Sequence, residues 1–357
     1  MLRRVLSPWS VLLLVGMVLV GFDNAARADT IYRRSVKTPV NGTVKDISKT
    51  ELTVEKKSGG GGTEKIPASD IVSITWSDEP PGLNIARINE NNGAYDKALE
   101  TYTKAVEQAS KGPDGLQADL KWAVARCVAR KSQGDSAKLD EAIKALETFK
   151  TGNGDHYTYF ECVRMLGELY LEKKDFLKSR TQFEALGKAT ATDSQMASKI
   201  ALGRIAQAEG KGDDAIASYD AVIAMTAANP SEEAQRLDAS LRKGTILLTK
   251  SQTDEAVKLL DEVIEKSAAD DTRIQAEAWV RKGDALRSKN SDLEALLAYL
   301  HVEVLFSAEK SQHAEALFQL HKLAAKLGQP ARAAEFREKL EADYPNSDWT
   351  KQLKTAG

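Results

Sequence analysis

The sequence predicts a mainly α-helical chain: an α-solenoid of about seven helix-turn-helix repeats, preceded by a small all-β barrel. Residues near the N-terminus alternate between apolar and polar, whereas the rest of the chain is rich in Ala, Leu, Glu and Lys without that alternation. In this second part a pattern of small and large apolar residues returns every 36 to 44 residues, which is typical of stacked repeats. A length of 357 residues also exceeds what one ordinary core organises.

The composition narrows the classes of protein further. Hydrophobic residues make up 42% and charged residues 29%, so the chain is neither a disordered tail nor a multi-span membrane protein. The formal net charge of -2 gives no general attraction to nucleic acid or anionic lipid. Aromatic residues contribute 6%, which is low for a β-sandwich core and suits helices packed through Ala, Leu and Gly.

Residues 1 to 28 are predicted to be a secretory signal peptide. Arg3 and Arg4 precede an apolar run over residues 11 to 20, and Ala26 and Ala28 form an A-x-A cleavage pattern. The apolar run is shorter than the roughly 20 residues that a spanning helix needs. We therefore expect an exported protein, periplasmic or extracellular after cleavage near Ala28, with no membrane span in its mature form.

Residues 29 to 80 are expected to form the small barrel. Apolar and polar residues alternate over residues 40 to 44, 52 to 54 and 71 to 76, and Gly42 and the glycines at 59 to 62 supply turn positions. Roughly five short strands fit a closed or nearly closed barrel, because an open sheet of this size would leave an unprotected edge. The order of these segments resembles SH3-like and Sm-like small barrels, and Pro80 and Pro81 end the module.

Some Sm-like barrels bind RNA, which would require aromatic side chains for base stacking on a basic face. Only Tyr32 and Trp76 are available in this module, among charges of both signs. The expected partners therefore do not include nucleic acid, and an adaptor or oligomerising role is favoured for the barrel.

The repeat pattern consists of a small residue, then Ala or Ser twelve positions later, then a large apolar residue four positions further on. The sets are Gly167, Ser179 and Phe183; Gly203, Ala215 and Tyr219; Gly244, Ala256 and Leu260; Gly283, Ala295 and Tyr299; and, upstream, Ala86, Ala98 and Tyr102. These residues resemble the tetratricopeptide repeat family, in which small residues let the two helices of a unit approach closely. The resemblance implies a solenoid over residues 81 to 345, with residues 346 to 357 as a capping helix or tail.

Two units depart from the family pattern. Residues 134 to 139 form an insertion at the internal turn of repeat two, and His321 occupies the small position of repeat seven, ahead of Ala333. The spacing also exceeds the roughly 34 residues of the family's minimal unit. The helices or the loops between repeats must therefore be longer.

The resemblance also implies that the first helix of each repeat lines a concave face, which holds an extended segment or helix of a partner. Carried over to this sequence, the candidate partner-binding residues are Arg164, Glu168, Arg204, Gln207, Leu241, Thr245, Leu248, Asp284, Arg287, Phe318 and Lys322. They combine apolar anchors with both signs of charge. A preference for acidic C-terminal peptides, which would need clustered Lys, Arg and Asn, is not supported.

Cys127 and Cys162 are the two cysteines of the chain. In an oxidising compartment they could pair if their Cα atoms came within roughly 7 Å. We expect them on neighbouring repeats at different heights, so a disulfide and two separate buried thiols both remain open.

No catalytic, metal or cofactor site is predicted. Of the four histidines, His313 and His321 are eight residues apart on one predicted helix, too far apart to share a metal ion. The sequence contains no nucleophile-elbow, phosphate-loop or dinucleotide motif. We therefore expect that the protein is not an enzyme.

These observations predict a non-enzymatic protein–protein interaction scaffold of the cell envelope, which binds a protein or peptide segment in its concave groove. The alternative is a structural envelope protein that assembles with itself as a homo-oligomer and holds no peptide guest. Carbohydrate binding is disfavoured, because few Trp and Tyr residues are expected on the inward face. The sequence does not identify the partner.

Overall fold

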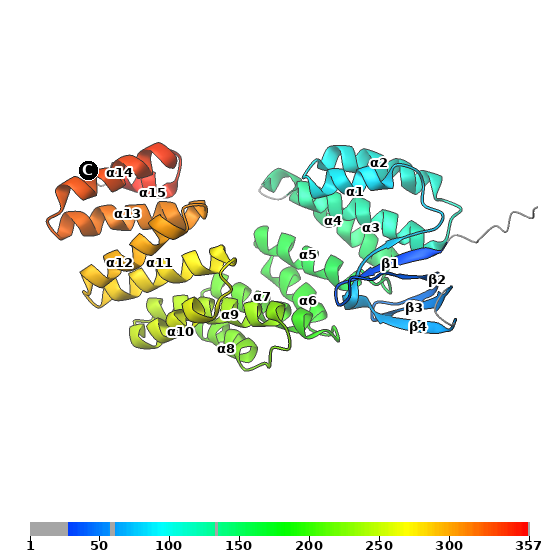
Figure 1. Cartoon of the computed structure of the whole chain (residues 1–357), viewed down its shortest axis with the longest axis horizontal. Helices are drawn as coiled ribbons and strands as arrows, with labels where there is room; N and C mark the ends of the chain where they lie inside the picture. The colour runs from blue at the N-terminus through cyan, green and yellow to red at the C-terminus, as the bar shows by residue number, and fades with distance from the viewer. Residues whose placement is uncertain (1–27, 58–60, 133–134, 356–357) are drawn as a thin grey trace, which may run out of the picture.

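The computed structural model describes residues 28–57, 61–132 and 135–355. A β-sheet module lies at one end of the molecule and helices α13 to α15 lie at the other, with the helical chain curving between them (Figure 1). Apart from Ala28, the predicted signal peptide lies outside the described residues. No helix in the described part is both long and apolar enough to cross a membrane.

The β module is a five-stranded antiparallel sheet with the strand order β4-β3-β2-β1-β5. The strands are β1 (Asp29–Arg33), β2 (Val40–Ile47), β3 (Glu51–Lys56), β4 (Thr63–Pro67) and β5 (Ile71–Thr75), with the short 3-10 helix η1 (Ala68–Asp70) before β5. Buried alternate residues such as Ile31, Leu52 and Ile66 form its core. Arg33 on β1 contacts Glu64 on β4 at 2.9 Å, although two strands separate them, so the sheet is strongly curled. The SH3-like or Sm-like identity of the module stays a prediction.

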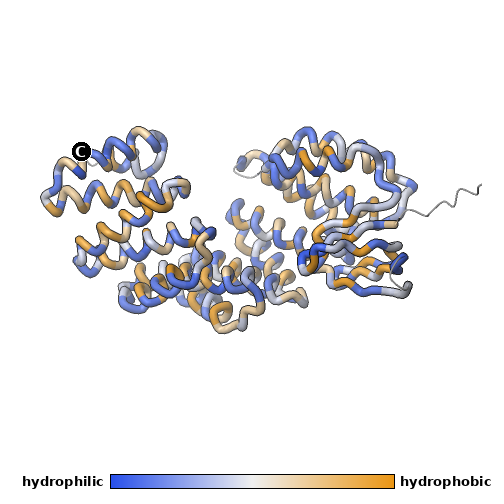
Figure 2. Tube along the Cα trace, in the orientation of Figure 1, coloured by the Kyte–Doolittle hydropathy of each residue, from blue (hydrophilic) through white to orange (hydrophobic). Residues whose placement is uncertain are grey.

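Seven antiparallel helix pairs follow, which we call repeats one to seven. They are α1 (Leu83–Asn91) with α2 (Tyr95–Gln108), α3 (Asp114–Lys131) with α4 (Leu139–Gly152), α5 (Tyr159–Glu172) with α6 (Phe176–Leu186), α7 (Thr192–Ala208) with α8 (Gly212–Ile223), α9 (Pro230–Thr249) with α10 (Thr253–Lys266), α11 (Thr272–Ser288) with α12 (Asp292–Leu305), and α13 (Lys310–Lys326) with α14 (Pro330–Asp343). Figure 2 shows hydrophobic and hydrophilic residues interleaved along these helices, as expected when each helix buries one face. The predicted fold class, a helical solenoid after a small β module, is confirmed.

The predicted close approach within each repeat is present. A Cβ atom placed on Gly167, Gly203 or Gly283 would lie 2.5–2.6 Å from the ring of Phe183, Tyr219 or Tyr299, respectively. Each aromatic ring of the second helix therefore occupies the space where a first-helix side chain would stand. Gly244 is looser, because the nearest atoms of Leu260 lie 3.5 Å from the corresponding position.

The two atypical repeats keep the same helix pairing. The insertion predicted in repeat two contains a second 3-10 helix, η2 (Ser136–Lys138), just before α4. In repeat seven, Nδ1 of the half-buried His321 is hydrogen-bonded to the carbonyl oxygen of Ala333 on the second helix, at 2.8 Å. In repeat three, Ser179 Oγ donates a similar hydrogen bond to the carbonyl of Gly167, at 2.8 Å. In repeat seven the bond from His321 thus joins the two helices at the position where the other repeats have a small residue.

Both ends of the solenoid are covered. At the C-terminal end α15 (Asp348–Thr355) packs against α13 and buries Leu353. At the N-terminal end the β module shares one continuous hydrophobic core with the first two repeats. Trp76, which follows β5, packs directly against Gly115 at the start of α3. The glycine leaves room for the indole, and the β module is fixed to repeat two at this point.

The glycine–aromatic contacts lead to a testable difference between glycines. Gly203→Ala would place a methyl group against the Tyr219 ring, and overpacking of this kind costs about 1–3 kcal/mol of unfolding free energy. Gly244→Ala meets only ordinary contacts, and the better helix propensity of Ala contributes up to about 1 kcal/mol. Urea unfolding of the two variants should therefore give shifts of opposite sign. Equal effects would show that the tight approach does not govern stability.

Candidate functional site

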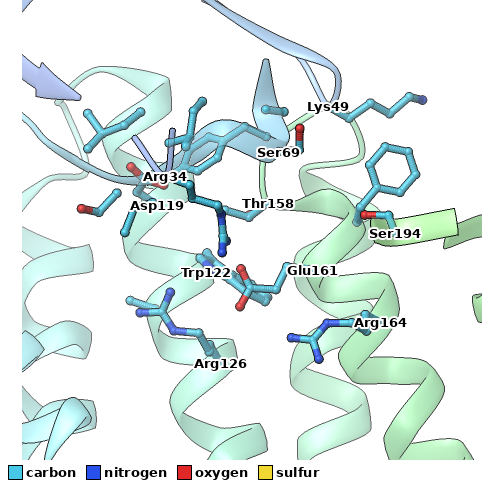
Figure 3. A pocket seen from close by; sticks show the side chains of 18 of the residues that line it. Arg34, Lys49, Ser69, Asp119, Trp122, Arg126, Thr158, Glu161, Arg164 and Ser194 are labelled. Atoms are coloured by element: carbon cyan, nitrogen blue, oxygen red, sulfur yellow. The ribbon is translucent and has the colours of Figure 1, made fainter. Parts of the chain in front are cut away.

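A cleft of about 750 Å³ lies between the β module and the first helices of repeats one to four. The β module contributes Arg34, Lys49, Ser69 and residues 71–74 of β5, and the opposite wall comes from α1, α3, α5 and α7. Figure 3 shows side chains from both walls pointing into this space, among them Arg34, Glu161 and Arg164. The cleft therefore joins two modules that are separate in the sequence.

A buried charge network forms one side of the cleft. The carboxylate of Glu90 is 3% exposed and accepts hydrogen bonds from Arg126 at 2.6 and 2.8 Å, from Arg130 at 2.8 Å and from the Tyr102 hydroxyl at 3.0 Å. Burial by itself would raise the pKa of Glu90, but the hydrogen bond and charge of Arg126 outweigh it and lower the pKa. Two guanidinium groups thus share one carboxylate, which leaves this wall positively charged.

Asp119 on α3 connects the β module to the repeats. It accepts hydrogen bonds from Trp76 Nε1 and from the Tyr157 hydroxyl, both at 2.7 Å, and His156 Nε2 lies 3.5 Å away. Burial raises the pKa of Asp119 to about 6, although the bonds from Tyr157 and Trp76 act in the opposite direction. Burial also lowers the pKa of His156 to about 4, so the imidazole is neutral near pH 7.

The centre of the cleft holds charges without partners. Arg34 and Arg164 make no ion pair or side-chain hydrogen bond with any described residue, whereas the charge of Glu161 acts on Arg126. The Nε1 atom of Trp122, which also lines the cleft, is buried and has no hydrogen-bond partner there. A buried N–H without an acceptor is costly, so this group favours a ligand that brings an acceptor.

Most of the candidate residues predicted from the sequence lie outside this cleft. Arg204 is paired with Glu168 at 2.8 Å, and Arg287 lies 3.8 Å from Asp284. Arg281 joins Asp284 and Glu315 across α11 and α13 at 2.5 and 2.7 Å. Charges on adjacent first helices thus pair between repeats three and four, five and six, and six and seven. Among the predicted residues, Arg164 is the one that lines the cleft.

The apolar and uncharged candidates are largely engaged in packing or local bonds. Leu241 is 1% exposed and Phe318 is 7% exposed beneath Trp349 of α15, with Lys322 over the Phe318 ring. Leu248 packs on the core of repeats five and six, and Thr245 donates to the carbonyl of Leu241 in its own helix. Gln207 accepts from the Tyr219 hydroxyl at 3.4 Å. These positions do not gather into one surface with Arg164.

The sequence analysis missed Arg34, Trp122, Arg126 and Glu90. Arg34 was assigned to the barrel, and nothing in the sequence indicates that this part of the barrel faces the repeats. The sequence does contain one indication of the Glu90–Arg126 ion pair. Glu90 and Arg126 are separated by about one repeat length, as are Glu168 and Arg204. Opposite charges at that spacing lie on adjacent first helices.

The two thiols are buried and unpaired in the structure. Cys127 belongs to the core shared with the β module, whereas Cys162 lies in the next core and donates to the Leu146 carbonyl at 3.4 Å. Burial raises the pKa of both thiols to about 12, so neither is reactive as a thiolate. No cluster of three or more metal-ligating side chains occurs in the part of the chain that the structure describes.

Stacked helix pairs with a concave face define a class of protein-interaction scaffold. Comparison with known families makes this specific: tetratricopeptide repeat models match residues 83–111, 200–271 and 241–304. The chain therefore contains tetratricopeptide repeats, as the sequence pattern predicted.

Solved structures support the same fold. A tetratricopeptide repeat protein from Parabacteroides merdae has a TM-score of 0.53 and 14% identity, with 76% of this chain and 95% of that chain covered. The apo form of RapI has a TM-score of 0.55 and 12% identity, with 76% and 79% covered. No curated protein matches the sequence. At these identities the likeness concerns the fold alone.

The buried charge network around Glu90 predicts that two Glu→Ala substitutions lower the unfolding free energy by different amounts. Glu90→Ala removes the acceptor of two partly buried guanidinium groups, and breaking a buried pair costs about 3–5 kcal/mol. Glu168→Ala removes an ion pair that is only partly buried, and pairs near the surface contribute at most about 1 kcal/mol. Chemical denaturation of both variants tests this. Similar small losses would mean that Arg126 and Arg130 are fully hydrated without Glu90.

Asp119 predicts a pH dependence with a defined sign. Its folded pKa of about 6 lies above the ordinary aspartate value of 3.8, so between these pH values the folded state holds a proton that the unfolded state has lost. Protonated Asp119 therefore adds to the unfolding free energy, by about 3 kcal/mol at most. This stabilisation is fully present below pH 4 and is lost as the pH rises through 6. Compared with Asp119→Asn, the wild-type protein should therefore lose relative stability between pH 4 and 7. A constant difference in unfolding free energy over that range would contradict this.

Proposed function

We propose that the protein is a non-enzymatic interaction scaffold of the cell envelope, which binds a segment of a partner protein in the cleft between the β module and repeats one to four. The observation that carries the proposal is the contrast in charge pairing along the concave face. Further along the concave face, charged residues such as Glu168, Arg204 and Arg281 are paired, whereas Arg34, Arg164 and the Trp122 N–H are without partners in the cleft.

The envelope location rests on the sequence of residues 1 to 28, with its basic start, apolar run and A-x-A pattern. The β module acts in this proposal as one wall of the binding site. That role agrees with the adaptor function expected from its resemblance to SH3-like and Sm-like barrels.

Self-assembly is the second candidate, and one observation favours it. Helix α12 carries an apolar stripe that no other described residues cover: Leu293, Leu297, Val304 and Leu305 are 52–67% exposed. Such a stripe suits contact with another protein surface, and a second copy of the chain is one such surface.

Site-specific photo-crosslinking in producing cells tests the proposed function. A photoreactive amino acid at Val72, in the cleft, should yield a discrete adduct with another protein, and the added change Arg164→Glu should reduce that adduct at least tenfold. Leu177, 78% exposed on α6, is the matched control position and should give no such adduct. Adducts only at Leu177, or only between copies of the chain, would refute the cleft as the binding site.

A further inference from the structure

Strand β5 is an edge of the sheet and lines the cleft with its edge rather than with one face. The sheet order ends at β5, whose ladder partner is β1. Four successive residues, 71 to 74, line the cleft. Because neighbouring strand residues point to opposite faces, a strand that presented one face would contribute only alternate residues.

The free edge of β5 carries main-chain groups that need partners. Apart from the bond that the Ile71 N–H donates to the Ala68 carbonyl, no backbone hydrogen bond of residues 71–74 reaches a described residue outside β1. An uncovered strand edge is a template for pairing with another chain. The edge is also shaped locally: the register shifts between Tyr32 and Arg33, so that Val72 is the extra residue of a bulge and is 56% exposed. Bulges of this kind redirect a side chain beside a site.

The opposite wall determines the chemistry of the segment that would pair with β5. Six basic and four acidic residues line the cleft, although the whole chain has a net charge of -2. Arg126 and Arg130 already share Glu90, and Asp119 is held by Trp76 and Tyr157. Arg34 and Arg164 are therefore available for a further carboxylate, with Glu161 and Asp193 as the remaining acidic residues of the lining.

We propose that the cleft binds an extended acidic segment of a partner protein as an additional strand on the free edge of β5. Main-chain groups of the segment pair with residues 72–74, and an internal Asp or Glu side chain of the segment lies between Arg34 and Arg164. A carbonyl or carboxylate oxygen accepts from Trp122 Nε1. This inference rests on the proposed function, since it specifies the conformation and charge of the segment in the same cleft.

The first part of the test is a selection from a display library of random octapeptides, with the selected sequences then synthesised with blocked ends. We expect enrichment of Asp or Glu in the middle of the peptide and of β-branched residues around it. Arg34→Glu and Arg164→Glu should each weaken binding at least tenfold. Arg287→Glu, in α11 of repeat six and outside the cleft, is the matched control and should leave affinity unchanged. Basic or helix-forming consensus sequences would overturn the charge and strand assignments.

The second part examines the strand pairing itself. Hydrogen exchange on the complex should show new protection of amides in β5, and N-methylation along the peptide should abolish binding at alternate positions only. Binding without protection of β5, or a peptide insensitive to N-methylation, would overturn strand addition while the proposed cleft function stands. If no selected peptide depends on Arg34 or Arg164, and none protects residues lining the cleft, both the proposed function and this inference fail.

Discussion

The close approach of two helices within each repeat is the constraint on which the rest of the structure depends. Gly167, Gly203 and Gly283 admit an aromatic ring of the second helix where a methyl group would not fit, and this sets the distance and the register of the pair.

A second, weaker set of contacts repeats between units, in which an Asp near the start of a second helix pairs with a Lys near the end of the next first helix. These pairs are Asp96–Lys131, Asp140–Lys173, Asp213–Lys250, Asp254–Lys289 and Asp292–Lys326. The Asp side chains are mostly exposed, so such pairs add little stability individually, but their signs match the helix dipoles and favour one stacking register.

The helical part of the fold was predictable because the constraint is local and recurrent. Gly203 and Tyr219 lie sixteen residues apart in one helix pair, and the same spacing recurs in other repeats, so the sequence alone carries the signal. The β module was predictable for a similar reason, since alternation along residues 52 to 54 and 71 to 76 reflects burial on one face. Its curvature was harder to predict, because the contact between Arg33 and Glu64 depends on how strongly the whole sheet curls.

The site was predictable only in part, because it lies between modules and not within a repeat. Arg164 follows from the repeat frame, but Arg34 enters the cleft only because Trp76 packs on Gly115 and is hydrogen-bonded to Asp119. Phe318 illustrates the opposite case. The repeat frame places it on the inward face, yet α15 brings Trp349 to 5.2 Å from it and covers it. Contacts made by the ends of a solenoid are not periodic, so a periodic pattern does not indicate them.

The cleft lies at the N-terminal end of the solenoid, where the contacts between neighbouring elements are not periodic. Along the middle of the solenoid each first helix has a neighbour on both sides, so charges such as Glu168 and Arg204 find partners on adjacent helices. At the N-terminal end the neighbour is a β-sheet whose edge strand β5 offers main-chain groups, not a matching row of charged side chains. Arg164 has first helices on both sides that leave it without an ion pair, and the part of the β module that lines the cleft brings no carboxylate to it. The Trp122 N–H likewise has no acceptor. The groups left unpaired beside the β module are therefore ones that a partner segment with its own carboxylate and backbone would satisfy.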